Sequence, residues 1–116
     1  MKTVEFILMK QPEEYMKNTY KIIWTDEAYK NLQHIVSYLE KFWTSSEIRK
    51  FAKLLDKQLI LIKKNPALYP YSNKSSQIRK SVLTKQTTLY YKVIDSEIYL
   101  ISLFDTRQSP EKLKLD

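Results

Sequence analysis

Two helical patterns follow one another with almost no linker between them, and this feature constrains the fold most. In each pattern the apolar residues recur at spacings of three or four, which places them on one face of a helix. Because only Thr44-Ser45-Ser46 separates the patterns, the two helices are predicted to form an antiparallel hairpin. The first apolar stripe is Ala28, Leu32, Ile35, Val36, Leu39 and Phe42, and the second is Ile48, Phe51, Ala52, Leu55, Leu59 and Ile62.

The ends of both helices carry recognisable signals. Thr25 is a predicted N-cap, and the acidic pair Asp26-Glu27 suits the positive end of the first helix dipole. Thr44-Ser45-Ser46 offers a second cap. The second helix is expected to end at Lys63-Lys64-Asn65, because Pro66 disfavours helical geometry in the residue before it.

Short apolar or alternating runs on either side of the hairpin indicate strands. One run precedes the helices, and three follow them after Pro66–Ser76, which is rich in Pro, Tyr and Ser and reads as a surface loop. The order predicts an α+β domain with an N-terminal strand, an antiparallel helix hairpin and a three-stranded antiparallel meander in one small sheet. The predicted strands are 20–24, 78–83, 87–94 and 97–104, with a tight turn at Asp95-Ser96.

The last strand is apolar on both faces. Strict alternation puts Ile98, Leu100, Ser102 and Phe104 on one face, and Tyr99, Ile101 and Leu103 on the other. A strand buried on both sides is expected in the middle of a sheet.

The 116 residues suffice for one domain. Residues 1–15 form a predicted N-terminal extension, because Pro12 interrupts a weak alternation and Met16 offers a second possible start. The domain is therefore expected to span residues 16–116. The apolar run Val4–Met9 is too short for a membrane span or a signal peptide, so a cytoplasmic protein with no membrane partner is expected.

Composition excludes several classes of site. The chain has no glycine, which rules out the P-loop, the dinucleotide fingerprint and the nucleophile elbow, and no cofactor is expected. It has no cysteine and one histidine, His34, so neither thiol chemistry nor a zinc or histidine-rich metal site is expected.

The formal charge of +7 is concentrated in one stretch. Between Arg49 and Lys92 there are eleven basic residues and one acid, Asp56, which gives this stretch a net charge of +10. Such a surface suits RNA, DNA or an acidic protein partner. A solvated lysine face that maintains solubility is an equally good interpretation.

A few side chains are candidates for chemistry or binding. One of Arg79 and Lys80 faces the helices and the other faces outward, where a cation could grip phosphates. The same argument applies to Tyr90 and Tyr91, of which one is core and the other either stacks on a base or covers the sheet. In the loop after the last strand, function is favoured for Arg107, whereas Asp105 is interpreted as shaping the turn through an ion pair with Arg107. His34 is interpreted as a surface residue.

The ordered set of these segments resembles the RelE/ParE toxins of bacterial type II toxin–antitoxin systems. The resemblance covers Tyr20 to Leu113. It is carried by Tyr20-Lys21-Ile22-Ile23-Trp24-Thr25, Asn65-Pro66, Tyr69-Pro70, Ile78-Arg79-Lys80-Ser81-Val82-Leu83, Leu89-Tyr90-Tyr91-Lys92-Val93 and the segment from Ile98 through Asp105-Thr106-Arg107-Gln108-Ser109-Pro110. It implies a toxin that a cognate antitoxin neutralises in a hetero-oligomer. RelE-like members cut messenger RNA on the ribosome with basic side chains and often a Tyr or His, whereas ParE-like members poison DNA gyrase.

The sequence departs from the nuclease pattern at two positions. Thr88 stands where RelE-like members have a basic residue before Leu-x-Tyr, and Ser81 replaces the second of two alternating basic residues. A ParE-like toxin acting on gyrase is therefore favoured, with target-binding candidates Arg79, Lys80, Lys85, Arg107 and Gln108. The first alternative is a metal-independent, ribosome-dependent mRNA endoribonuclease, whose catalytic candidates are Arg79, Tyr91 and Arg107. A non-toxic nucleic-acid-binding or corepressor module is a further alternative.

Overall fold

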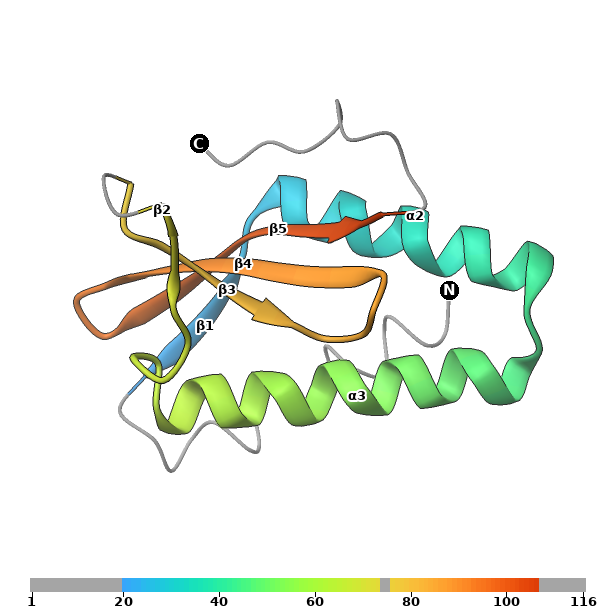
Figure 1. Cartoon of the computed structure of the whole chain (residues 1–116), viewed down its shortest axis with the longest axis horizontal. Coiled ribbons are helices and arrows are strands. Elements are labelled where there is room, and N and C mark those ends of the chain that lie inside the picture. Colours follow the sequence, from blue (N-terminus) through green and yellow to red (C-terminus); the bar gives the residue numbers. More distant parts are fainter. Residues whose placement is uncertain (1–19, 74–75, 107–116) are drawn as a thin grey trace.

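The computed structural model describes residues 20–73 and 76–106, which fold into two helices and a five-stranded sheet (Figure 1). The predicted α+β architecture with a helix hairpin is confirmed. The elements are β1 (Lys21–Trp24), α2 (Asp26–Phe42), α3 (Ser45–Lys64), β2 (Tyr71–Asn73), β3 (Ile78–Val82), β4 (Thr87–Ile94) and β5 (Glu97–Asp105).

Side-chain caps fix where both helices begin. The hydroxyl of Thr25 accepts a hydrogen bond from the amide of Ala28 at the start of α2. It also donates to the carbonyl of Leu100 at 2.6 Å, so the cap joins the helix to β5. Thr44 and Glu47 form a reciprocal capping box at the start of α3. Since both caps are sequence signals, the predicted helix limits agree with the structure.

The sheet has the order β1-β5-β4-β3-β2, with β1 parallel to β5 and the other pairs antiparallel. β5 lies between β1 and β4, which confirms the prediction of a central strand. The prediction of an uninterrupted loop over Pro66–Ser76 was wrong, because Tyr71–Asn73 forms the short edge strand β2. This strand adds a fifth member to the four that were predicted.

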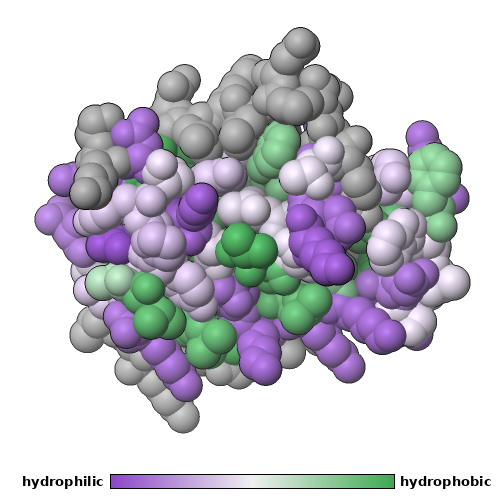
Figure 2. All heavy atoms as spheres, viewed as in Figure 1, coloured by the Kyte–Doolittle hydropathy of each residue, from purple (hydrophilic) through white to green (hydrophobic). Residues whose placement is uncertain are grey.

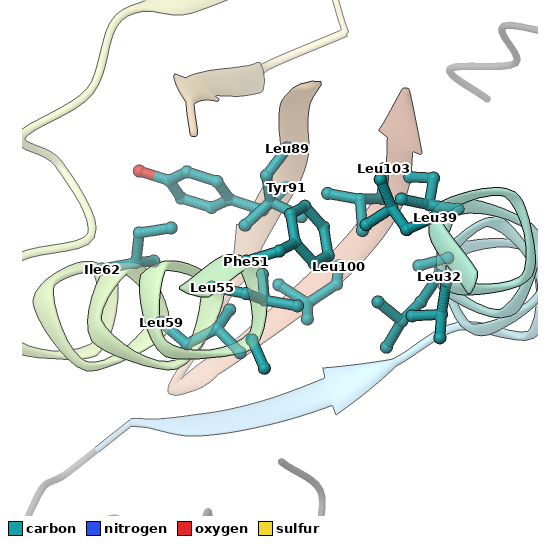
Figure 3. Packing of buried hydrophobic residues seen from close by; sticks show 14 of the residues in the cluster. Leu32, Leu39, Phe51, Leu55, Leu59, Ile62, Leu89, Tyr91, Leu100 and Leu103 are labelled. Atoms are coloured by element: carbon teal, nitrogen blue, oxygen red, sulfur yellow. The ribbon is translucent and has the colours of Figure 1, made fainter. Parts of the chain in front are cut away.

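One core lies between the two helices and one face of the sheet. Leu89 and Tyr91 of β4 pair with Leu103 and Leu100 of β5, so these four side chains share a face. They pack with the buried stripes of α2 and α3, and Figure 3 shows the two helices on either side of this cluster. We call this side of the sheet the helix face and the opposite side the far face. Gln58 donates a hydrogen bond to Ser81, which ties α3 to β3.

A β-bulge in β5 changes which residues reach the core. Tyr90 pairs with Ser102 but Tyr91 pairs with Leu100, so Ile101 is the extra residue. The predicted alternation was therefore wrong beyond this point: Leu103 joins the core, while Phe104 is only partly buried and shifts to the far face. The bulge is held by α2.

Asn31 of α2 makes that connection. Its amide oxygen accepts hydrogen bonds from the hydroxyl of Ser102 and the backbone N–H of Leu103, both at 3.0 Å. Its amide nitrogen donates to Glu27 at 3.1 Å. One side chain thus satisfies the backbone that the bulge leaves unpaired and fixes the register of the central strand against the helix.

The predicted extension 1–15 lies outside the described residues, as does Met16. In the part of the chain that the structure describes, neither helix has the length and apolar character that crossing a membrane would require.

Candidate functional site

The strand register separates the two neighbouring basic residues of β3. Arg79 pairs with Tyr91 and so lies on the helix face at the sheet margin, whereas Lys80 pairs with Tyr90 on the far face. Lys80 is exposed and Tyr90 is partly buried, and burial raises the pKa of Tyr90. Lys92 pairs with Tyr99 on the same face. The far face therefore presents two lysines and two tyrosines, and it is Lys80 rather than Arg79 that points outward.

Arg79 is engaged with the loop that follows α3. Its Nη1 donates to the carbonyls of Tyr69 at 2.6 Å and Ala67 at 3.3 Å, and its Nη2 donates to the hydroxyl of Tyr71 at 3.0 Å. The guanidinium also lies 4.0 Å from the centre of the Tyr71 ring. All four contacts are with uncharged groups, so Arg79 fastens the loop to β3, and within the described residues no carboxylate pairs with its positive charge.

Tyr91 belongs to the core. Its side chain is fully buried, and its hydroxyl donates to the carbonyl of Pro66 at 2.6 Å. Burial raises the pKa of Tyr91 to about 12, although the nearby charge of Arg79 acts to lower it. A hydroxyl held in this way is an anchor for the loop after α3 and does not reach the surface.

Thr88 lies on the far face, between Val82 of β3 and Phe104 of β5. Val82 is 65% exposed, and both neighbours are apolar. Among the described residues, the position that holds a cation in the nuclease pattern thus has two uncharged side chains as its cross-strand neighbours. Neither of these two neighbours can stabilise the extra negative charge of a phosphate under attack, and the next described cation along this face is Lys80 of β3.

The other candidates are two exposed residues, two residues outside the described part of the chain, and one buried acid. Lys85 is exposed in the turn between β3 and β4, and His34 is exposed on α2. Arg107 and Gln108 lie outside the described residues. Asp105 is buried at the end of β5 and accepts a hydrogen bond from the hydroxyl of Thr87 at 3.3 Å. The described residues contain no group of three or more His, Asp or Glu side chains that could hold a metal ion.

Sequence reasoning missed two features of this region. The first is the set of carbonyl acceptors that engages Arg79, for which the only signal is the Pro-rich loop between Asn65 and Pro70. The second is an apolar band over α3. Figure 2 shows apolar residues gathered over α3 and the adjoining sheet, and exposed apolar side chains of these elements include Leu54, Leu61 and Val82.

Comparison with known proteins supports the architecture. No model of a protein family matches the chain, and no curated protein matches it in sequence. Among solved structures, a chain of the chromosomal ParDE TA system from P. aeruginosa superposes with a TM-score of 0.64 at 13% identity. The match covers 75% of this chain and 96% of that chain. At this identity the likeness establishes the fold, and the chain has the fold of that ParDE chain.

Proposed function

We propose that the protein is the toxin of a type II toxin–antitoxin pair, that it is ParE-like, and that it acts on DNA gyrase. The fold shared with a chain of a ParDE TA system supports the toxin–antitoxin assignment. The observation that favours gyrase over messenger RNA is the apolar setting of Thr88, between Val82 and Phe104.

The chemistry of RNA cleavage explains why this setting matters. Without a metal, the reaction needs a base, an acid and cations around the pentacoordinate phosphate. Of the described candidates, Tyr91 is buried with its hydroxyl bonded to Pro66, and Arg79 is bonded to loop carbonyls. His34 lies on α2, whose core stripe packs against the helix face, and so it is remote from Thr88. These positions favour a toxin that works by binding a protein.

The antitoxin is expected to cover the apolar band on α3. Leu54 is 45% exposed and Leu61 is 39% exposed. A groove of about 170 Å³, lined mainly by Leu39, Trp43, Phe51 and Leu54, continues the band towards the end of α2. Exposed basic residues of α3 flank it: Arg49, Lys50, Lys53, Lys57 and Lys64. An acidic amphipathic segment matches both the apolar and the charged parts of this surface.

Lys80 and Lys85 are proposed to contact gyrase, together with Arg107 and Gln108. The first two are exposed, on the far face and in the β3–β4 turn respectively.

The test uses purified protein and gyrase on plasmid DNA. If the protein poisons gyrase, cleaved plasmid should accumulate. Changing both Lys80 and Lys85 to Gln should then reduce the amount of cleaved plasmid severalfold. Lys30→Gln on α2 removes an exposed charge outside this surface and should change the amount of cleaved plasmid little. Supercoiling that proceeds normally with no cleaved DNA would contradict the gyrase proposal.

A further inference from the structure

A recess lies where the C-terminal end of α3 meets the start of β1 and the edge of β3. Its volume is about 310 Å³. Lys64 ends α3 and Asn65 caps it, Tyr20 precedes β1, Tyr71 belongs to β2, Gln77 precedes β3 and Arg79 belongs to β3. These six residues define what we call the Arg79 recess. It is distinct from the far face on which Lys80 and Thr88 lie.

The electrostatics of the recess favour an anion. Two of its lining residues, Lys64 and Arg79, are cationic, and among the described residues none that lines it is acidic. Arg79 has five N–H donors, of which three are used by Ala67, Tyr69 and Tyr71. The Nε donor and one Nη2 donor remain for a ligand. Because the three partners are neutral, the charge of the guanidinium is not cancelled within the described part of the chain.

The other lining residues suit a planar group beside that anion. Tyr20 is partly buried, and Tyr71 is 43% exposed with the Arg79 guanidinium over one face of its ring, so each leaves part of an aromatic ring for stacking. The side-chain amides of Asn65 and Gln77 can donate to and accept from the edge of a base. The volume lies at the lower end of the range for ligand pockets, which is room for one nucleotide.

We propose that the Arg79 recess binds a single nucleotide that carries a terminal phosphate. Arg79 and Lys64 hold the phosphate, while the tyrosines and amides receive the base. The chain has no glycine with which to build a backbone phosphate cradle, and side-chain cations take that role here. This binding is additional to the proposed action on gyrase and does not depend on it.

The test is a titration of the isotopically labelled full-length protein with AMP, followed by backbone amide chemical shifts. Saturable shifts are expected at Lys64, Asn65, Ala67 and residues 77–79. Adenosine and inorganic phosphate, titrated separately, should each bind more weakly than AMP, because each lacks half of the contacts. Lys64→Gln removes one charge-assisted contact and should weaken AMP binding by roughly tenfold.

Two comparisons keep the result interpretable. Lys64 is exposed, so its replacement leaves the hydrogen bonds of Arg79 in place and the protein folded. Lys30→Gln removes an exposed charge from α2, away from the recess, and it should alter AMP affinity by less than about twofold. The proposal is overturned if AMP produces no saturable shifts, if the two variants weaken binding equally, or if adenosine or phosphate alone binds as tightly as AMP.

Discussion

Replacing Tyr91 by Phe tests whether this residue anchors the fold or serves chemistry. The ring is kept, so the packing against Leu89 and Leu100 is preserved, but the 2.6 Å hydrogen bond to the carbonyl of Pro66 is lost. A buried carbonyl left without its donor costs about 1–3 kcal/mol. We expect a loss of about 2 kcal/mol, which corresponds to a fall in the melting temperature of roughly 8 °C for a domain of this size.

The same variant makes a prediction about alkaline pH. The pKa of Tyr91 is about 12 in the folded protein and about 10 in the unfolded chain. The folded state therefore keeps a proton that the unfolded state releases, and the stabilisation from this group is complete below pH 10 and is lost as the pH rises towards 12. Lysines and the other tyrosines titrate in both proteins, so only the contribution of Tyr91 differs between them. The free energy of unfolding of the wild type should therefore fall more steeply over this window than that of Tyr91→Phe.

Urea unfolding at neutral pH and at steps between pH 9 and 12 would measure both effects. Tyr90→Phe is the matched control, because Tyr90 is adjacent, only partly buried and makes no hydrogen bond within the described residues. It should change stability by less than about 0.5 kcal/mol. A stable Tyr91→Phe variant that has lost toxicity would refute the structural role and indicate a catalytic one.

Three further predictions follow from the core, the extension and the basic surface. Asn31→Ala should destabilise the domain by about 1–3 kcal/mol in urea unfolding, because the Leu103 N–H loses its acceptor, whereas Gln33→Ala on the same helix should be nearly neutral. A chain that begins at Met16 should melt within about 1 kcal/mol of the full chain; a larger loss would mean that residues 1–15 stabilise the domain. Antitoxin association, followed by stopped flow, should slow steeply with added salt, and a salt-independent rate would count against electrostatic steering.

The helices were predictable because local signals determine their ends. The hydroxyls of Thr25 and Thr44 each accept a hydrogen bond from a backbone N–H in the first turn of a helix, and Pro66 limits the C-terminal end of α3. The strand β2 was not predictable in the same way. Its three residues follow Pro70 and carry no alternation, so only the edge of β3 defines it.

The bulge in β5 could not be predicted from the composition of the strand. Ile98 to Phe104 is apolar on both faces, so moving the alternation by one residue leaves no visible mismatch in the sequence. The structure reveals the shift through the pairs that surround Ile101 and through Asn31, whose partners lie more than seventy positions away.

The candidate site could be predicted only as a set of residues. The sequence places Arg79 beside Lys80 and Tyr90 beside Tyr91, and it requires each pair to split between two faces. The register of β3 against β4 determines which member of each pair faces the helices, and these members are Arg79 and Tyr91. No local signal distinguishes the two arrangements, because both members of each pair are the same kind of residue.

We propose that this chain acts on gyrase and not on messenger RNA. Inducing the protein in bacteria without an antitoxin, while following DNA-damage signalling and the integrity of messages together, tests it most directly. We expect growth arrest with strong damage signalling and intact messages, since Thr88 is uncharged and its cross-strand neighbours, Val82 and Phe104, are apolar. Codon-positioned cleavage of messages on ribosomes, abolished by Arg79→Ala or Arg107→Ala, would contradict the claim and establish the nuclease instead. Normal growth with neither signal would contradict both and leave a non-toxic binding module.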